Sequence, residues 1–197
     1  MRLVLASGSP RRSDLLGTLG LAFDVVPPDV DETRFPDEPP AAYVERISRA
    51  KAEVVAAPGA LVIAADTAVV FDGRVLGKPA HPEEARSMLR RLQGETHDVF
   101  TALAVASWDG APVITSMVDV TEVEMLAMTE YEIASYVESG EPMDKAGAYA
   151  LQGRGGRYVT RISGSPFTVV GLPIHLLDRL IASTGARLSQ FGAGEAG

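Results

Sequence analysis

The chain has 197 residues, of which 46% are hydrophobic and 22% are charged, and this composition predicts a globular protein of one or at most two domains. The formal net charge of -8 argues against a broad surface for nucleic acids or anionic membranes. Because the chain has no cysteine, disulfides and thiolate chemistry are excluded. A chain without cysteine is most simply interpreted as cytoplasmic, which is the location we expect. No run of about 18 apolar residues is present, so we expect no membrane span.

The first part of the chain predicts alternating strands and helices. The expected elements are, in order, a strand at 2–6, a helix over 10–19, a strand at 22–26, a loop over 27–40, a helix over 41–57, a strand at 60–65 and a hairpin over 67–77. The helix over 41–57 rests on the spacing of its apolar residues, which are Tyr43, Val44, Ile47, Ala50 and Val54.

The second part predicts longer strands and further helices. The expected elements are a helix over 82–93, two strands within 97–126 about the turn Asp109-Gly110, a helix from the capping box at Thr129 to about Ser139, a Gly-rich segment, a strand at 157–162 and a helix over 173–183. The pattern is that of a mixed α/β protein, with βα alternation followed by a central antiparallel block.

The first candidate site is the segment Ser7 to Arg12, at the start of the first helix. Ser9 is the expected N-cap and Pro10 the first helical residue, so Arg11 and Arg12 lie where exposed N–H groups carry partial positive charge. An anion bound between the N–H groups and the guanidinium groups would explain both cations. The alternative is a well-capped helix whose arginines are simply solvated.

The second candidate is Asp66-Thr67, directly after the apolar strand at 60–65. Open α/β sheets present their ligands at the ends of such strands, so Asp66 is expected to bind a metal or to polarise a water molecule. The alternative is an aspartate that accepts hydrogen bonds from neighbouring backbone N–H groups.

The third candidate combines the acids Asp31 and Glu32 with Lys51 and Lys78. Paired carboxylates suit Mg²⁺, which takes one or two of them together with substrate phosphates, and lysines supply charge for a polyphosphate. The alternative is an acidic loop with surface lysines.

The fourth candidate is the Gly-rich stretch DKAGAYALQGRGG, whose glycines would allow the backbone to approach a ligand closely. Gln152 offers both a donor and an acceptor, as recognition of a nucleobase edge requires. The alternative is a flexible connection. His81, His97 and His175 lack metal-ligand spacing and are expected to be structural or at the surface.

Taken in order, these segments resemble a known family. The motifs are LASGSPRR, Asp31-Glu32, RAKAE around Lys51, AADTAVV, GKP, DKAGAYALQG and ISGSPFTVVGLP. They are similar to those of the Maf family of nucleoside triphosphate pyrophosphatases, over about residues 3 to 180. The form of the DKAGAY motif resembles the branch that acts on dTTP and UTP.

The resemblance implies a fold and an assembly. The implied fold is a long twisted mixed β-sheet with two α/β lobes around a deep cleft, related to the inosine triphosphate pyrophosphatases. It would form one Maf-like domain over residues 1–190, with residues 191–197 as a disordered tail. The resemblance further implies a homodimer, activity with Mg²⁺ or Mn²⁺, and a role in nucleotide house-cleaning or in arresting cell division.

The resemblance also assigns roles to the candidate residues, in hydrolysis of dTTP or UTP to the monophosphate and pyrophosphate. The expected catalytic residues are Asp66, Lys78, Lys51 and Glu32. The expected substrate-binding residues are Ser7, Ser9, Arg11, Arg12, Thr67 and Gln152. Glu32 and Asp66 are the expected metal ligands, and the sequence leaves open whether Asp66 is the base or acts through a metal.

Three other functions remain alternatives. A nucleotidyltransferase also places a glycine-containing loop and arginine after its first strand, but it needs a second substrate. A nucleotide-binding regulator of septum formation would bind nucleotide without releasing pyrophosphate. The other branch of the same family acts on 7-methyl-GTP.

Overall fold

The computed structural model describes residues 1–192, and these divide into two compact units. The first unit comprises Met1–Asp66, Thr101–Asp119 and Gly171–Gly197, apart from the last five residues, which are not described. The second unit comprises Thr67–Phe100 and Val120–Val170. Three long strands therefore contribute residues to both units.

The strands are β1 (Arg2–Ala6), β2 (Asp24–Val25), β3 (Ala60–Phe71), β4 (Arg74–Leu76), β5 (Thr96–Asp109), β6 (Ala111–Met125) and β7 (Val159–Ser163). The α-helices are α1 (Pro10–Gly17), α2 (Pro40–Val55), α3 (Pro82–Leu92), α4 (Glu130–Glu138), α5 (Pro166–Val170) and α6 (Leu177–Ser183). Short 3₁₀ helices are η1 (Glu141–Asp144), η2 (Ala146–Ala148), η3 (Arg154–Tyr158), η4 (Ile174–Leu176) and η5 (Leu188–Phe191).

The strands form one mixed sheet in the order β2-β1-β3-β5-β6-β7, with β4 paired to β3. Strand β1 is parallel to both β2 and β3, whereas β4 is antiparallel to β3 and β7 is antiparallel to β6. The parallel strands have apolar residues on both faces, because helices cover both faces in a parallel sheet. The predicted mixed α/β fold is confirmed.

Strand β3 differs from the prediction in a way that matters for function. The sequence predicted that the apolar strand ends before Asp66, whereas β3 continues without interruption through Asp66 and Thr67 to Phe71. Asp66 therefore lies inside a strand and not at its end. A buried aspartate inside a strand requires a partner, and Asp66 has one in the Lys51 ammonium group, at 2.7 Å.

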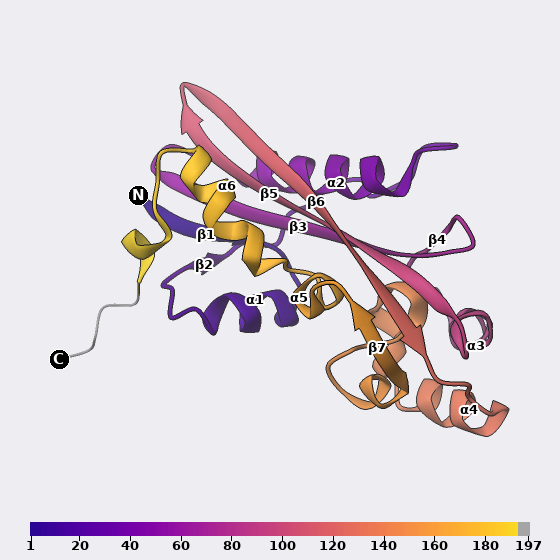
Figure 1. Ribbon diagram of the computed structural model, residues 1–197. Helices are drawn as coiled ribbons and strands as arrows, with labels where there is room; N and C mark the ends of the chain where they lie inside the picture. Colours follow the sequence, from indigo (N-terminus) through magenta and orange to yellow (C-terminus); the bar gives the residue numbers. More distant parts are fainter. Residues whose placement is uncertain (193–197) are drawn as a thin grey trace. The chain divides into compact units, whose positions relative to one another are not determined.

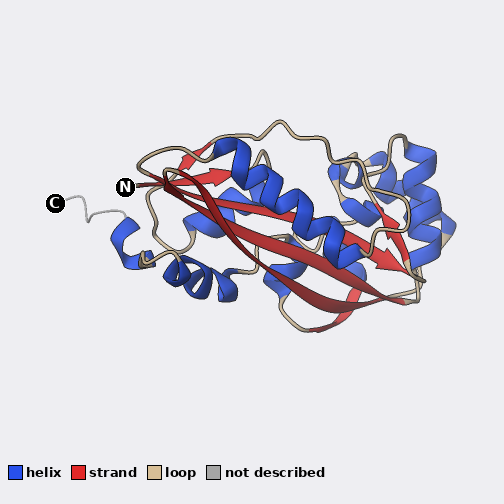
Figure 2. Cartoon of the chain, turned by 90° about the horizontal axis from the view of Figure 1, so that it is seen from above, coloured by secondary structure: helices blue, strands red, loops and turns tan. Residues whose placement is uncertain are grey.

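In the first unit, α2 covers one face of the strands and α1 and α6 lie on the other (Figures 1 and 2). Alternate residues of the strands face α2, as the period of two in a strand requires. The core beneath α2 consists of small side chains, which are Val4, Ala6, Ala52, Ala60, Val62, Ala64, Ala104 and Ala106. Small side chains let the helix lie close to the sheet.

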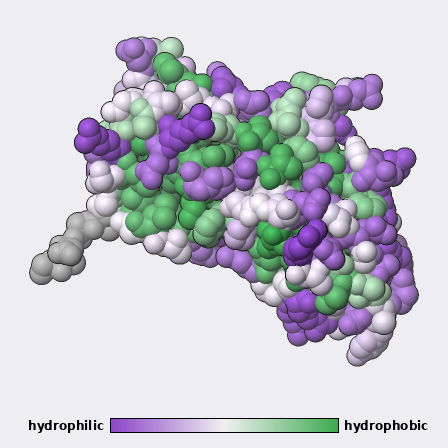
Figure 3. Space-filling view, in the orientation of Figure 1, coloured by the Kyte–Doolittle hydropathy of each residue, from purple (hydrophilic) through white to green (hydrophobic). Residues whose placement is uncertain are grey.

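The opposite face of the first unit carries the larger core residues. Leu3, Leu5, Leu61 and Ile63 are fully buried and have the other parity along β1 and β3. Figure 3 shows hydrophobic residues gathered in the area where Figure 1 draws α1 and α6. These two helices bury their own leucines, including Leu16, against this face of the sheet.

The buried face of α2 is only partly the predicted one. Its inward residues are Val44, Ile47, Ser48, Lys51 and Ala52, at the helical spacing of three and four. Val54, which the apolar pattern placed inward, is 58% exposed. The prediction for Val54 is wrong, and the inward stripe includes two polar residues, Ser48 and Lys51, in addition to apolar ones.

The second unit has its own apolar core, in which α3 packs against α4 and η2. The predicted capping box at the start of α4 is confirmed, because Thr129 accepts from the Glu132 N–H and the Glu132 carboxylate accepts from the Thr129 N–H. Arg90 on α3 donates to both carboxylate oxygens of Glu130 on α4, at 2.9–3.1 Å. These contacts lie at the surface and complement the buried apolar packing.

Smaller differences concern the ends of elements. Helix α1 stops at Gly17, β2 is only two residues long, the first turn of the final helix is the 3₁₀ helix η4, and α5 was not predicted. Phe191, the first residue of the predicted tail, is buried, and its carbonyl accepts from the Ala22 N–H at 2.7 Å. The remainder of that tail, residues 193–197, lies outside the described residues.

Within residues 1–192, no helix combines the length and the apolar character that crossing a bilayer requires.

Substitution of Leu103 by alanine tests the assigned core of the first unit. Leu103 in β5 is fully buried, so Leu103→Ala is expected to lower the free energy of unfolding by about 2–5 kcal/mol, through lost burial and the cavity left behind. The matched control Val113→Ala removes a side chain that is 50% exposed and should change stability by less than about 0.5 kcal/mol. Urea denaturation measures both, and equal effects would contradict the assigned core.

Candidate functional site

A buried lysine between two carboxylates forms the centre of the candidate site. The Nζ atom of Lys51 lies 2.7 Å from Asp66 Oδ1 and 2.7 Å from Glu32 Oε1. The Lys51 and Asp66 side chains are almost completely buried, whereas the Glu32 side chain is 46% exposed. Three residues from the acidic loop, from α2 and from β3 therefore meet at one point of the first unit.

The strand and helix periods explain why these side chains meet. Asp66 has the same parity along β3 as Val62 and Ala64, so it points to the face that α2 covers. Lys51 is on the inward stripe of α2, one turn beyond Ile47. The inward stripe of α2 and the facing side of β3 meet at Lys51 and Asp66. A buried charge on one of these surfaces requires an opposite charge on the other.

Burial changes the protonation equilibria of the site. Desolvation raises the pKa of Asp66 above its ordinary value, although the nearby Lys51 and Arg12 cations oppose this effect. Desolvation and the Asp66 carboxylate together raise the pKa of Tyr43 to about 12, so its hydroxyl stays protonated. An aspartate with a raised pKa is a better proton acceptor than an exposed one.

Arg12 at the start of α1 belongs to the same electrostatic environment. Its Nε donates to the Gly171 carbonyl at 2.7 Å, and its Nη1 donates to Ser7 Oγ at 3.5 Å. Burial lowers the pKa of Arg12, while the charges of Asp66 and Glu32 oppose that change. Arg12 is therefore held by the protein and is not simply solvated.

The hydrogen bonds of Ser7 and Ser9 differ from the predicted N-cap arrangement. Ser9 is at the N-cap position, but its side chain makes no capping hydrogen bond. Instead, Ser7 is buried, and its Oγ accepts from the Ser9 N–H at 3.1 Å. Arg11 is half-buried, and its charge contributes to the lowered pKa of Arg12, so the two guanidinium groups are neighbours.

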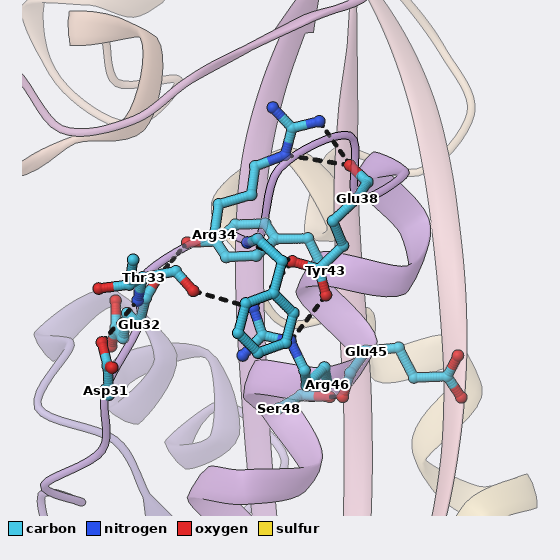
Figure 4. A network of polar contacts seen from close by, with 10 residues as sticks. Asp31, Glu32, Thr33, Arg34, Glu38, Tyr43, Glu45, Arg46 and Ser48 are labelled. Atoms are coloured by element: carbon cyan, nitrogen blue, oxygen red, sulfur yellow. Dashed lines mark hydrogen bonds and ion pairs between the residues drawn. The ribbon is translucent and has the colours of Figure 1, made fainter.

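The acidic loop that carries Glu32 is attached to α2 by Arg46, a residue outside the motifs of the sequence (Figure 4). Arg46 donates to both Glu38 carboxylate oxygens, at 2.7 and 2.8 Å, and to the Thr33 carbonyl at 3.0 Å. The Tyr43 hydroxyl donates to the Glu32 carbonyl at 3.1 Å. Two residues of α2 therefore hold the backbone at Glu32 and at the residue directly after it.

Arg46 also stacks on aromatic rings. Its guanidinium carbon lies 4.0 Å from the centre of the Phe35 ring and 5.8 Å from that of Tyr43. Such cation–π contacts favour the planar guanidinium over a lysine ammonium group. The sequence contained a signal for this role, namely an arginine three residues after Tyr43 and close to an acid-rich loop. The pattern did not indicate which acidic residue Arg46 would bind.

The remaining predicted site residues belong to the second unit. Thr67 follows Asp66 in β3 and is half-buried, while Lys78 and Gln152 are exposed in loops. The loop before Lys78 is attached to the Gly-rich segment, because the Gly147 N–H donates to the Gly77 carbonyl at 3.1 Å.

The Gly-rich segment is packed more tightly than a flexible connection would be. A Cβ atom at Gly147 would come within 2.9–3.0 Å of the Val69 side chain, and Ala148 next to it has a positive φ of 59°. The sequence predicted that these glycines let the backbone approach a ligand closely. At Gly147 the observed close neighbour is the protein's own β3.

The three histidines have structural environments. His81 caps α3, since its Nδ1 accepts from the Glu84 N–H. His175 lies 3.5 Å from Asp119. His97 is buried with its Nε2 2.8 Å from the Tyr149 hydroxyl, and burial lowers its pKa to about 4, so it is neutral.

The donor set fits a divalent cation that shares its coordination with a substrate. Among the described residues, no three His, Asp or Glu side chains form a self-sufficient metal site. Glu32 Oε1 and Asp66 Oδ1 nevertheless each lie 2.7 Å from Lys51 Nζ, so the two carboxylates are neighbours. One or two carboxylates together with phosphate oxygens is the set that Mg²⁺ takes in enzymes that act on phosphates.

The geometry therefore defines an α/β protein whose site combines lysine, arginine and carboxylates, as handling of a phosphorylated compound requires. Comparison with known proteins gives the family. The model of the Maf-like protein family matches residues 2–184, and the chain belongs to that family.

Curated relatives carry a common name. The dTTP/UTP pyrophosphatase of Anaeromyxobacter dehalogenans strain 2CP-C is 52% identical over 185 residues, which cover 93% of this chain and 94% of the relative. The dTTP/UTP pyrophosphatase of Vibrio vulnificus strain YJ016 is 48% identical and covers 91% of this chain and 97% of its own length. That of Myxococcus xanthus is 47% identical, with 94% of each chain covered.

Solved structures show more distant similarity. The Ham1 protein of Staphylococcus aureus is 14% identical with a TM-score of 0.47, over 93% of this chain and all of its own chain. A nucleoside-triphosphatase described as a dITP/XTP pyrophosphatase, from Mycobacterium abscessus, is 12% identical with a TM-score of 0.42, over 94% of this chain and 98% of its own.

Replacement of Arg46 tests how the acidic loop is held. Arg46→Met keeps the length of the side chain but removes the hydrogen bonds that Arg46 donates to Glu38 and Thr33. Because the acidic loop then keeps only the Tyr43 attachment of its backbone to α2, we expect faster amide exchange at residues 31–38 and a loss of kcat/KM of about ten- to a hundredfold on the preferred nucleotide.

The control for this prediction is Arg49→Met on the same helix. Arg49 donates to the Ile114 carbonyl and to Ser116, away from the acidic loop. It should leave amide exchange at residues 31–38 unchanged. An Arg46→Met variant with wild-type exchange and activity would refute the anchoring role.

The raised pKa of Asp66 predicts a pH dependence of stability. Its ordinary value is 3.8, and burial raises it in the folded state. The folded state then binds a proton that the unfolded state has already released, so the stability that Asp66 contributes is complete below pH 3.8 and is lost as pH rises through the folded-state pKa.

The Asp66→Asn variant lacks this titration. The free energy of unfolding of the wild type, minus that of the variant, should therefore fall as pH rises from about 4 to about 8. Urea denaturation across that range measures the difference. A difference that stays constant or increases with pH would contradict the raised pKa.

Proposed function

We propose that this protein hydrolyses dTTP and UTP to the nucleoside monophosphate and pyrophosphate. The observation that carries the proposal is the Lys51 ammonium group held between Asp66 and Glu32, with Arg12 close enough to influence the pKa of Asp66. Curated relatives at 44–52% identity over most of the chain, all named dTTP/UTP pyrophosphatase, support the same activity.

In this reaction a water molecule attacks the α-phosphorus, and pyrophosphate leaves with the electron pair of the broken P–O bond. Negative charge develops on the bridging and terminal oxygens, so fixed cations lower the barrier by electrostatic stabilisation. Lys51, Arg11 and Arg12 supply these cations in the first unit. Lys78 is a further cation for the triphosphate.

Asp66 takes the proton that the attacking water releases. Its burial favours this role, because desolvation raises its affinity for a proton, and the adjacent Lys51 keeps the carboxylate ionised at the start of the reaction. Glu32 is more exposed and is fixed by its loop, so it faces the substrate with its carboxylate already in place.

Glu32 and Asp66 would hold a divalent cation, Mg²⁺ or Mn²⁺. Such an ion neutralises phosphate charge and lowers the pKa of a bound water molecule. The protein's own contribution is a pair of neighbouring carboxylates with the positive charge of Lys51 between them.

The other predicted residues complete substrate binding in the proposal. Ser7 and Ser9 at the start of α1 offer hydroxyl and backbone donors to a phosphate, and Thr67 adds a hydroxyl directly after Asp66. Gln152 reads the base, since its amide can pair with both the carbonyl and the N–H of a uracil or thymine edge. We further propose a cytoplasmic homodimer, following the family resemblance of the sequence.

Asp66→Asn tests the base. It keeps the shape of the side chain but cannot take the proton, so kcat should fall by at least about 100-fold while nucleotide affinity changes far less. The matched control is Asp72→Asn in the exposed β3–β4 turn, which makes the same chemical change and should keep wild-type turnover. Near-normal turnover of Asp66→Asn would remove the assigned role.

A panel of nucleoside triphosphates with Mg²⁺, resolved by chromatography, tests the activity. The proposal expects monophosphate and pyrophosphate from dTTP and UTP without a second substrate. A need for a co-substrate would indicate a nucleotidyltransferase, and binding without pyrophosphate release would indicate a regulator. A preference for 7-methyl-GTP would place the chain in the other branch of the family.

A further inference from the structure

The loop that carries Gln152 is attached at both ends to two side chains near the end of α4. Ala150 lies on one side of Gln152, and Arg154 and Gly155 lie on the other. Between these attachments Leu151 is half-buried, whereas Gln152 and Gly153 are exposed. The two side chains that make the attachments are Tyr136 and Glu141, and neither was singled out from the sequence.

The far end of the loop is bound by the Glu141 carboxylate. Its Oε2 accepts from the Arg154 N–H at 2.9 Å, and its Oε1 accepts from the Gly155 N–H at 3.0 Å. Two successive backbone N–H groups on one carboxylate form a bidentate, charge-assisted contact, which is stronger and more directional than a neutral one. The position of residues 154–155 therefore follows that of Glu141.

The near end of the loop is bound by Tyr136. The Tyr136 hydroxyl accepts from the Ala150 N–H at 3.1 Å and donates to Glu141 Oε1 at 2.8 Å. The two attachments are thus linked to each other through one hydrogen bond. Tyr136 is 3% exposed, and its ring belongs to the core of the second unit, so the hydroxyl is a fixed point.

Glu141 is itself held in place. Its N–H donates to Ser139 Oγ at 3.3 Å, and its carbonyl accepts from Lys145 Nζ at 2.9 Å. Although desolvation raises the pKa of Glu141, the hydrogen bonds from Arg154, Tyr136 and Gly155 outweigh it and hold the pKa below the ordinary value. The carboxylate is therefore ionised at neutral pH and accepts all three hydrogen bonds.

Steric contact explains two of the glycines in this loop. A Cβ atom at Gly153 would lie 2.7 Å from Glu141 Oε2, and one at Gly155 would lie 2.3 Å from the Tyr136 hydroxyl oxygen. Gly153 also has φ of 124°, which side chains rarely permit. The loop packs directly on the two polar side chains, so a displacement of Glu141 is transmitted to its backbone.

We propose that Tyr136 and Glu141 are positioning residues for base recognition: they fix the backbone on both sides of Gln152 and so determine the preference for uracil and thymine. This inference rests on the proposed function, in which Gln152 reads the base. Neither residue touches the reacting atoms. Both act through the conformation of the loop, so they should control discrimination between bases more than the chemical step.

The test compares UTP with CTP, which are similar in size but present opposite donor and acceptor patterns at the edge of the base. The variants are Glu141→Gln, which replaces one acceptor oxygen by a donor NH₂ group facing backbone N–H groups, and Tyr136→Phe, which removes only the hydroxyl. The matched control is Glu138→Gln, which removes the same charge from an exposed residue at the end of α4. The measurements are kcat and KM for each nucleotide, with the melting temperature of each variant.

For Glu141→Gln we expect the ratio of kcat/KM for UTP to that for CTP to fall by about tenfold or more, mainly through KM for UTP. Tyr136→Phe should lower the same ratio by a smaller factor, because Glu141 still holds the far end of the loop. Glu138→Gln should keep the wild-type ratio. Gln152→Glu should lower the ratio without altering the melting temperature.

The outcomes separate the inference from the proposed function. A wild type without preference for UTP over CTP would overturn the proposed base specificity and the inference with it. A wild type with that preference, retained in both Glu141→Gln and Tyr136→Phe, would overturn the inference alone. Equal loss of activity on both nucleotides, in step with a lower melting temperature, would assign the pair to folding and also overturn the inference.

Discussion

The contact between Lys51 and Asp66 is the interaction on which the rest of the site depends. Both side chains are buried, and each would be costly there without the other. Their pairing allows β3 to run through Asp66 as a continuous strand and allows α2 to place a charged residue on its inward stripe. The charges of this pair act on their neighbours. Lys51 also binds Glu32, and the Asp66 carboxylate helps to raise the pKa of Tyr43 and opposes the lowering of the pKa of Arg12.

The two units support their functional residues by the same device. In the first unit, Tyr43 and Arg46 on α2 bind the backbone carbonyls of Glu32 and Thr33 in the acidic loop. In the second, Tyr136 and Glu141 bind the backbone on both sides of Gln152. In each case a side chain anchored in or beside a helix orders a loop, so the cost of ordering that loop is met during folding and not during substrate binding.

Much of the fold followed from local patterns. The alternation of elements, the capping box at Thr129 and the turn after Asp109 depend on residues close together in the sequence, and the structure confirms them. The errors occurred where a distant residue decided the outcome. Strand β3 was predicted to end before Asp66, because its apolar pattern does not reveal that Lys51 on α2 pairs with Asp66. Val54 was predicted to face inward but is exposed, because the inward stripe of α2 includes the polar residues Ser48 and Lys51.

The sequence by itself determined the fold class, the family resemblance and the set of residue types able to act on a triphosphate, because these depend on periodicity and on ordered motifs. Only the tertiary structure decided which of these residues meet. It joined Glu32, Lys51 and Asp66 in one contact, and it revealed Arg46, Tyr136 and Glu141 as the groups that hold the functional loops. Hydrogen bonds between residues far apart in the sequence leave no periodic trace, so they become visible only when the chain has folded.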